Sequence, residues 1–244
     1  MRTIAYLIAL TGGVAFFGLT CILAGLFRVR YVADGVYDWC QRGFSRTILR
    51  CTRIPVVVEG AEHVAAEGPQ IVVSSHASFF DTIALLAHLP VSPKFIAKKE
   101  VYGIPVFGGA IRAAGHIRMD RGNRTQAFGA YEDAARQMRE KRLTIVVYAE
   151  GTRSRTGDLL PFKKGPFVFA IGSGAPIIPC YVGGVFGIQP KGSVRVRKRT
   201  ICIALGEPIA TRGLQAEDRD ALQARVREAM EALKKSVDAR FPFA

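Results

Sequence analysis

The sequence contains a histidine and an aspartate at a spacing that suits general base catalysis. His76 follows a short apolar run, Ile71–Ser74, that is typical of a strand, and Asp81 stands where a helix would begin. A chain that turns there can bring both side chains within hydrogen-bond reach, so that the carboxylate orients the imidazole and leaves its other nitrogen as a base. The spacing alone is weak, because a surface histidine beside an N-capping aspartate gives the same pattern.

A second group of polar residues follows another strand candidate, Thr144–Tyr148. Gly151 permits a sharp turn or a close backbone approach. Thr152 supplies a hydroxyl, and Arg153 supplies a bidentate fork for a phosphate. An ordinary strand-to-loop turn with solvated charges would look similar, so this group also needs a partner elsewhere in the chain to indicate a site.

The elements that must position these groups alternate between short β-branched runs and helical segments. This alternation predicts an α/β fold, with a mixed, largely buried sheet flanked by helices. The strand candidates are Pro55–Val58, Ile71–Ser74, Phe95–Ala97, Ile117–Met119, Thr144–Tyr148, Ile177–Val182 and an interrupted Val194–Leu205. The helix candidates include Asp81–His88, Arg124–Lys141, Pro166–Ser173 and Glu217–Val237.

The composition is that of a core-forming chain with a large basic surplus. Of 244 residues, 49% are apolar and the net charge is +14, which excludes a disordered protein and indicates a polyanionic partner. An anionic membrane surface or a phosphate-bearing substrate explains the charge better than nucleic acid, because no nucleic-acid recognition motif is present. The spacing of cysteine and histidine predicts no metal site.

The N-terminus is long and apolar enough to anchor the chain in a membrane. The 25 residues Thr3–Phe27 carry no charge. As a straight helix they would extend about 37 Å, more than the bilayer core of about 30 Å. Gly12 and Gly13 allow a kink, so a helix that dips into one leaflet is an alternative to a full span. The arginines that follow place the rest of the chain in the cytoplasm, by the positive-inside rule.

Residues 31–53 show the spacing of an amphipathic helix. Its apolar positions are Val32, Val36, Trp39, Gly43, Phe44, Ile48 and Cys51. Trp39 and the neighbouring arginines suit a membrane interface, whereas a helix packed on the catalytic domain would show the same pattern. The chain therefore divides into a membrane-anchoring segment, 1–53, and a catalytic domain, 54–244.

The polar blocks, in their order along the chain, resemble those of the glycerolipid acyltransferases, in particular the bacterial 1-acylglycerol-3-phosphate O-acyltransferases. The resemblance covers about residues 54–210. The first family block, Asn/Ser-His-x4-Asp, is matched by Ser75, His76 and Asp81. The later blocks are matched by Gly115, Ile117, Asp120 and Arg121, by Glu150, Gly151, Thr152, Arg153 and Ser154, and by Pro179. The sequence departs from the family at Arg118 and at Tyr148-Ala149, where the family has an aromatic residue and Phe-Pro.

The resemblance implies transfer of a fatty acyl group to the sn-2 hydroxyl of 1-acylglycerol 3-phosphate, which gives phosphatidic acid for phospholipid biosynthesis. His76 would be the base and Asp81 would orient it. The substrate-binding residues would be Arg121 and Arg153 on the phosphate, Lys98 as a weaker candidate, and the Glu150-Gly151-Thr152 loop, which either orders the site or touches the glycerol. The acyl donor would be acyl-CoA or acyl-carrier protein, with no other cofactor.

The expected location is the cytoplasmic face of a bacterial inner membrane, with anionic lipids as partners. The sequence is also compatible with two alternatives. One is an acyltransferase for another lysolipid, such as a lyso-ornithine lipid, for which Arg121 and Arg153 would matter less. The other is a non-catalytic basic membrane adaptor, which would not require the pair of His76 and Asp81.

Overall fold

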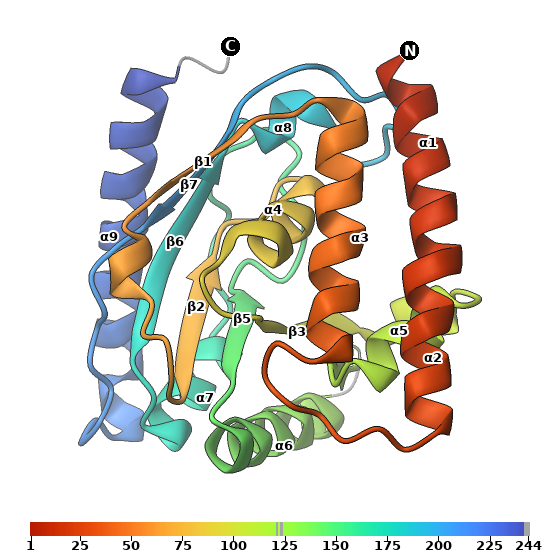
Figure 1. Ribbon diagram of the computed structural model, residues 1–244. Coiled ribbons are helices and arrows are strands. Elements are labelled where there is room, and N and C mark those ends of the chain that lie inside the picture. The colour runs from red at the N-terminus through yellow and green to blue at the C-terminus, as the bar shows by residue number, and fades with distance from the viewer. Residues whose placement is uncertain (121, 123, 242–244) are drawn as a thin grey trace.

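The computed structural model describes residues 1–120, 122 and 124–241 of the chain (Figure 1). Within this described part, the strands form one seven-stranded sheet in the order β1-β7-β6-β2-β5-β3-β4. The strands are β1 (Val56–Glu59), β2 (Gln70–Ser74), β3 (Lys94–Lys98), β4 (Ile117–Met119), β5 (Thr144–Tyr148), β6 (Ile177–Gly183) and β7 (Ile201–Leu205).

The direction of the strands brings the polar blocks together. Strands β6, β2, β5, β3 and β4 are mutually parallel neighbours, whereas β7 is antiparallel to β6 and carries β1 parallel to itself. The carboxyl ends of parallel strands lie at one edge of the sheet, and a ligand site of an open α/β sheet is usually built there. The loops after β2, β5 and β4 all leave from this edge, and His76, Glu150 and Asp120 lie within the first two residues of these loops.

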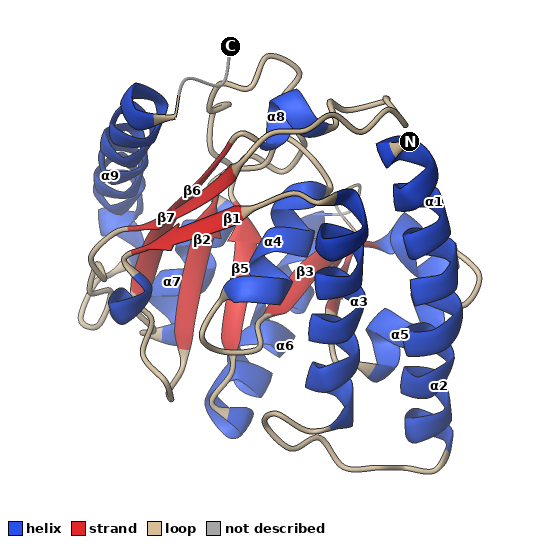
Figure 2. Cartoon of the chain, turned by 45° about the horizontal axis from the view of Figure 1, so that its top comes forward, coloured by secondary structure: helices blue, strands red, loops and turns tan. Residues whose placement is uncertain are grey.

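Helices cover both faces of the sheet, as Figure 2 shows. The helices are α1 (Arg2–Gly13), α2 (Leu19–Leu26), α3 (Val36–Thr52), α4 (Phe80–His88), α5 (Phe107–Ala113), α6 (Arg124–Lys141), α7 (Gly165–Ser173), α8 (Val185–Ile188) and α9 (Arg219–Arg240). Short 3-10 turns are η2 (Ala61–His63), η3 (Lys99–Gly103) and η4 (Ala216–Asp218).

The alternation of side chains along each strand produces two cores. In β2, Val72 faces the core formed with α4, α3 and α1, and Ile71 and Val73 face the core formed with α6, α7 and α9. All three side chains are fully buried, which is expected for the central strand of a parallel sheet that helices cover on both faces.

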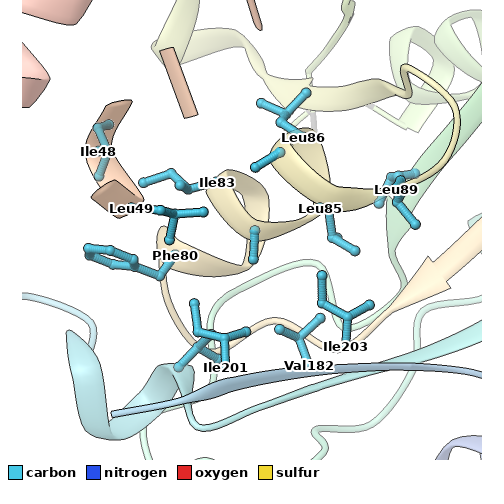
Figure 3. Packing of buried hydrophobic residues seen from close by; sticks show 14 of the residues in the cluster. Ile48, Leu49, Phe80, Ile83, Leu85, Leu86, Leu89, Val182, Ile201 and Ile203 are labelled. Carbon is cyan, nitrogen blue, oxygen red and sulfur yellow. The ribbon is translucent and has the colours of Figure 1, made fainter. Parts of the chain in front are cut away.

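Helix α4 is the element that joins the sheet to the N-terminal helices. Figure 3 shows Ile83 and Phe80 of α4 beside Ile48 and Leu49 of α3, with Ile203 of β7 on the other side of α4. Since α4 begins one residue before Asp81, this packing fixes the position of the carboxylate.

The N-terminal segment forms a helical hairpin on the outside of α4. Residues Arg2–Leu26 make one continuous helix of 25 residues, which contains α1, a π-helical turn, η1 (Val14–Gly18), and α2. It is long and apolar enough to cross a membrane. Helix α3 returns beside it (Figures 1 and 2). Tyr6 and Ala9 belong to the same apolar core as Phe80 and Ile83, so segment 1–53 and domain 54–244 share buried contacts.

The sequence predicted most of these elements and missed others. The strand predicted over Val194–Leu205 is wrong in its first half, because β7 begins at Ile201 and only its last five residues pair with β1 and β6. The predicted helix over 31–53 is α3, but it begins at Val36. Of its predicted apolar positions, Phe44 and Ile48 pack on the domain, whereas Trp39 and Cys51 are exposed. Helices α5 and α8 were not predicted.

Candidate active site

The imidazole of His76 and the carboxylate of Asp81 form a hydrogen-bonded pair. Nδ1 of His76 donates to Oδ2 of Asp81 at 2.9 Å. Asp81 is completely buried, whereas 18% of the His76 side chain is exposed. This burial excludes a solvated histidine beside a surface cap. The pairing of Nδ1 directs the other ring nitrogen, Nε2, away from the carboxylate.

The turn between β2 and α4 is built around the same carboxylate oxygen. Oδ2 of Asp81 also accepts the backbone N–H groups of Ala77, at 2.9 Å, and Ser78, at 2.8 Å. The hydroxyl of Ser78 donates to the Gln189 carbonyl, and that of Ser75 accepts the Val182 N–H. Both serine hydroxyls are therefore used in holding the turn, which leaves His76 as the reactive group of this block.

Tyr148 supports the ring of His76 from one face. The two rings are stacked with their centroids 3.8 Å apart and an angle of 13° between their planes. The Tyr148 hydroxyl lies 2.8 Å from the hydroxyl of Thr82, which follows Asp81 in α4. Tyr148 is thus tied to the helix that carries the carboxylate, and it was missed as a site residue because the sequence showed it only as a departure from the family's Phe.

Glu150 connects the two polar blocks through its buried carboxylate. Oε1 accepts the backbone N–H of His76 at 2.9 Å, and Oε2 accepts that of Leu160 at 3.0 Å. The Ser154 N–H donates to the His76 carbonyl at 2.7 Å. Burial raises the pKa of Glu150 to about 7, against the two backbone hydrogen bonds that lower it. With both oxygens bound to backbone, Glu150 is placed to order the loops, the first of the two roles that the sequence left open.

The loop after Glu150 turns toward solvent and presents a cation. Gly151 adopts a left-handed conformation with φ of 72°, which a glycine tolerates without strain. Thr152 is exposed and accepts a hydrogen bond from Lys191 at 2.9 Å. Arg153 is half-buried and within electrostatic range of the Tyr6 hydroxyl. Among the residues described, no hydrogen bond or ion pair holds its guanidinium, so it can bind an anion.

Of the remaining sequence candidates, the structure describes Lys98 and does not bring it to His76. Lys98, at the end of β3, forms an exposed pair with Glu100 at 3.2 Å. Its neighbour Lys99, which the sequence did not single out, binds Asp120 at 2.6 Å, and this contact lowers the pKa of Asp120. Arg121 lies outside the residues that the structure describes.

Another histidine near the sheet edge has a structural role. Nδ1 of His116 accepts the backbone N–H of Phe95 at 3.0 Å. Burial lowers the pKa of His116 to about 3, so this ring stays neutral. Across the described ranges, no cluster of three or more His, Cys, Asp or Glu side chains is arranged to hold a metal ion.

The arrangement can perform base-assisted attack by a hydroxyl group. A hydroxyl placed at Nε2 of His76 could give up its proton as it attacks an electrophile, and Asp81 would balance the imidazolium that forms. The free guanidinium of Arg153 would hold an anionic part of the same substrate.

Comparison with known proteins supports the same interpretation. The family model described as Acyltransferase matches residues 55–183, more than half of the chain. The chain belongs to the acyltransferase family. His76, Asp81 and the loop from Glu150 to Arg153 all lie inside the matched range.

Curated relatives of this acyltransferase are identical to it at about a third of the aligned positions. It is 39% identical over 158 residues to a 1-acyl-sn-glycerol-3-phosphate acyltransferase of Limnanthes douglasii, an alignment that covers 65% of the chain and 56% of the relative. It is 32% identical over 177 residues to the alpha form from Homo sapiens, which covers 72% and 62%. The aligned part therefore spans a little over half the length of these relatives.

A solved structure matches nearly the whole acyltransferase chain. The crystal structure of the 1-acyl-sn-glycerophosphate (LPA) acyltransferase from Thermotoga maritima is 27% identical and superposes with a TM-score of 0.74, covering 96% of this chain and 97% of that one. The match includes the N-terminal hairpin as well as the α/β domain, and it confirms the predicted fold class.

Proposed function

We propose that this acyltransferase transfers a fatty acyl group to the sn-2 hydroxyl of 1-acylglycerol 3-phosphate and so forms phosphatidic acid. The observation that carries the proposal is the buried pair of His76 and Asp81, with the free guanidinium of Arg153 on the loop held to His76 by Glu150. The names of the relatives support the acceptor, because each is called an acyltransferase of 1-acylglycerol 3-phosphate.

In this mechanism the acceptor hydroxyl attacks the thioester carbonyl of the donor directly. Nε2 of His76 takes the proton from the hydroxyl as the new C–O bond of the ester forms. The C–S bond of the thioester then breaks, and the imidazolium returns the proton to the departing sulfur, so that the carrier leaves as a thiol. Asp81 keeps Nδ1 protonated and balances the charge on the ring. No acyl-enzyme is needed, since the nearby serine hydroxyls hold the backbone turn.

The donor is acyl-CoA or acyl-carrier protein, and it acts as a co-substrate. The base, its orienting carboxylate and the phosphate-binding arginine all come from the chain itself, so no further cofactor is required for the proposed step. Arg121, at the end of the second block, is proposed as a second phosphate-binding residue by resemblance to the family.

The N-terminal hairpin supports binding to one leaflet of the membrane. Helix α3 lies beside the 25-residue apolar helix; Arg46 and Arg50 of α3, and Arg53 directly after it, are exposed. A full span would carry these arginines into the hydrocarbon, at a cost of about 2.5–3.5 kcal/mol for each. We therefore favour insertion at the interface, on the cytoplasmic face of a bacterial inner membrane.

The proposed reaction is tested with purified protein, a radiolabelled acyl donor and a panel of lysolipids. We expect labelled phosphatidic acid from 1-acylglycerol 3-phosphate and no product from the His76→Ala variant. Labelling of a lysolipid without phosphate in preference to 1-acylglycerol 3-phosphate would favour the alternative acceptor. No acyl transfer to any lysolipid would favour a membrane adaptor.

A further inference from the structure

A groove lies on the outside of the N-terminal hairpin, away from His76. It is lined by Phe17, Asp34, Trp39, Arg42, Gly43, Arg46, Thr47 and Arg50, and its volume is about 360 Å³. Most of these residues belong to α3, and the groove adjoins the C-terminal end of α4. Asp81 is at the opposite end of α4, so the nine-residue length of this helix separates the groove from the active site.

The wall of the groove carries three guanidinium groups in a row. Arg42, Arg46 and Arg50 are spaced by four residues and lie on one face of α3. The opposing charge is the carboxylate of Asp34, and it forms no ion pair with them in the described part of the chain. The groove therefore has a net positive charge and favours an anion.

These arginines keep N–H groups free for a ligand. Arg42 donates to the carbonyls of Leu89, at 3.2 Å, and Pro90, at 3.4 Å, and Nε of Arg46 donates to the Ala87 carbonyl at 3.3 Å. Nε of Arg42 is buried and lacks a partner among the described residues. Both Nη groups of Arg46 and the whole guanidinium of Arg50 have no hydrogen bond of their own there. The Nη groups of Arg46 and the guanidinium of Arg50 suit a phosphate, which takes several guanidinium donors at once.

The other wall of the groove is aromatic and continues into an apolar surface. The Trp39 ring contacts Phe17 at 5.3 Å and Phe16 at 6.2 Å between centroids, in edge-on geometry. Trp39 and Phe16 are 52% and 61% exposed, and Leu19 and Leu23 extend the exposed apolar face along α2. A ligand that fits both walls has an anionic head and apolar chains.

Two features of the backbone position Phe16 and Phe17: the π-helical turn η1 and the glycine at position 43. Phe16 and Phe17 lie in the π-helical turn η1, a wide turn that is rare and frequently found at functional sites. Phe17 rests directly on Gly43, where a Cβ atom would come within 2.5 Å of the Phe17 ring. A side chain at position 43 would therefore displace the Phe17 ring.

We propose that this groove binds the phosphate headgroup of an anionic membrane phospholipid, with Trp39 at the level of the headgroups and the face of α1–α2 in the acyl chains. The proposal rests on membrane association of the hairpin, and it adds a lipid site that is separate from the acceptor site. It commits to a lipid rather than to free phosphate, because Phe17 and Trp39 line the same groove as the arginines and the neighbouring side chains of α2 are apolar and exposed.

The test compares two double variants of equal charge change. Arg46→Gln/Arg50→Gln removes two exposed arginines from the groove and spares Arg42, and Arg136→Gln/Arg139→Gln removes two exposed arginines from α6. Binding of the full-length protein to phosphatidylcholine vesicles is measured with and without phosphatidylglycerol. We expect the groove variant to lose about thirtyfold in affinity for the anionic vesicles, which corresponds to about 1 kcal/mol per arginine, and the α6 variant to lose less than about threefold.

A neutral variant and a soluble probe test the lipid assignment. Gly43→Ala, which displaces Phe17 without a change of charge, is expected to weaken binding to the anionic vesicles severalfold. Inorganic phosphate should compete no better than chloride at equal ionic strength. Equal losses in both double variants, or displacement by phosphate alone, would overturn the lipid site.

Acyl transfer measured in detergent separates this proposal from the proposed function. The groove variant should keep the activity of the parent protein there, because it retains His76, Asp81 and Arg153. If the parent protein bound anionic vesicles through the groove but acylated no lysolipid, only the proposed reaction would fail.

Discussion

At the scale of single residues, the site is organised around one imidazole that three neighbours hold. Asp81 binds Nδ1 of His76, Tyr148 covers one face of its ring, and Glu150 binds its backbone N–H. Together these contacts restrict the rotation and the position of the ring, and they leave Nε2 as the ring nitrogen that can contact a substrate. A base that is oriented before the substrate arrives does not need to be ordered during the reaction.

The first residue-scale prediction concerns this pair. His76→Ala should abolish acyl transfer, and Asp81→Asn should lower kcat by about a thousandfold or more, because the amide cannot balance an imidazolium. The measurement is kcat with 1-acylglycerol 3-phosphate, with thermal unfolding as the control for the fold. His76→Ala protein that kept a tenth of the parent rate would refute the assignment of the base.

The free guanidinium of Arg153 gives the second prediction. Arg153→Ala should raise KM for a phosphate-bearing acceptor about tenfold to a hundredfold, since a charge-assisted hydrogen bond contributes about 1.5–3 kcal/mol. KM for the acyl donor should change far less. Arg155→Ala, at an exposed position of the same loop, is the matched control. Equal increases for acceptor and donor would instead mean that Arg153 holds the loop.

The raised pKa of Glu150 gives a prediction on stability. The folded protein binds the proton of this carboxyl more tightly than the unfolded chain does, because burial raises its pKa from 4.5 to about 7. This contribution is fully present below about pH 4.5 and is lost as the pH rises through 7. Relative to Glu150→Gln, the free energy of unfolding should fall by up to about 3 kcal/mol across this window. A difference that did not vary with pH, in chemical denaturation of both proteins, would contradict it.

At the scale of elements, a buried ion pair fixes the hairpin to the sheet. Nζ of Lys94 in β3 lies 2.9 Å from Oδ1 of Asp38 in α3, and both side chains are almost fully buried. Asp38 also accepts the hydroxyl of Tyr31 and the amide of Gln41. Desolvation lowers the pKa of Lys94, against the raising effect of Asp38, so the ammonium depends on this carboxylate.

Removal of one partner should therefore cost more than removal of both. Asp38→Asn leaves a buried ammonium without its counter-charge, and we expect a loss of about 3–5 kcal/mol in the free energy of unfolding. The double variant Asp38→Asn/Lys94→Met should recover most of this loss. The check is chemical denaturation of the three proteins, and a double variant as unstable as the single one would show that the pair itself supplies net stability.

The elements that the sequence predicted are those with a local signal. Thr144–Tyr148 and Ile117–Met119 were predicted with their observed bounds. A β-branched run between turns favours a strand by its local sequence alone, whatever the surrounding fold. Helix α5 has two glycines in seven residues and little propensity of its own, and it exists because it packs on α2. The strand predicted from Val194 failed because pairing partners for β7 begin only at Ile201.

The same division holds for the candidate site. His76, Asp81 and Arg153 were found from residue type, spacing and family resemblance. Other contacts join elements that are distant in sequence, and no local pattern predicted them. They are the stacking of Tyr148 on His76, its contact with Thr82, and the ion pair of Lys99 with Asp120. The pattern of residues 31–53 left two positions open for Trp39, at a membrane interface or packed on the domain, and in the fold it is 52% exposed.

At the scale of the whole molecule, the proposed membrane binding of the hairpin would combine two kinds of contact. One face of α1–α2 packs on the protein through Tyr6, Ala9, Cys21 and Ala24, and the opposite face is apolar and exposed. A helix that is apolar on all sides is stable when both faces are buried. Lipid acyl chains would bury the outer face in the proposed binding mode. In the proposed binding mode, the arginines of α3 would add an electrostatic attraction at the level of the headgroups.

These two terms differ in their response to salt, which gives the last prediction. Charge attraction is screened within a Debye length, and insertion of apolar side chains is not. Ile8→Glu/Leu23→Glu changes two exposed positions of the outer face and leaves the packed face intact. We expect this variant to fold, to bind anionic vesicles at low salt and to wash off at high salt, where the parent protein stays bound. The measurement is vesicle co-sedimentation at both salt concentrations.

The control is Val168→Glu, which also replaces an exposed apolar side chain with glutamate but lies on α7, away from the hairpin. This variant should stay bound at high salt. The groove variant Arg46→Gln/Arg50→Gln should behave in the reverse way: it should lose its preference for anionic vesicles but resist salt. If Ile8→Glu/Leu23→Glu protein remained on the vesicles at high salt, the outer face of α1–α2 would not be the inserted surface. The anchor would then have to be sought among the other exposed apolar side chains, beginning with Phe27 and Val32 in the turn before α3.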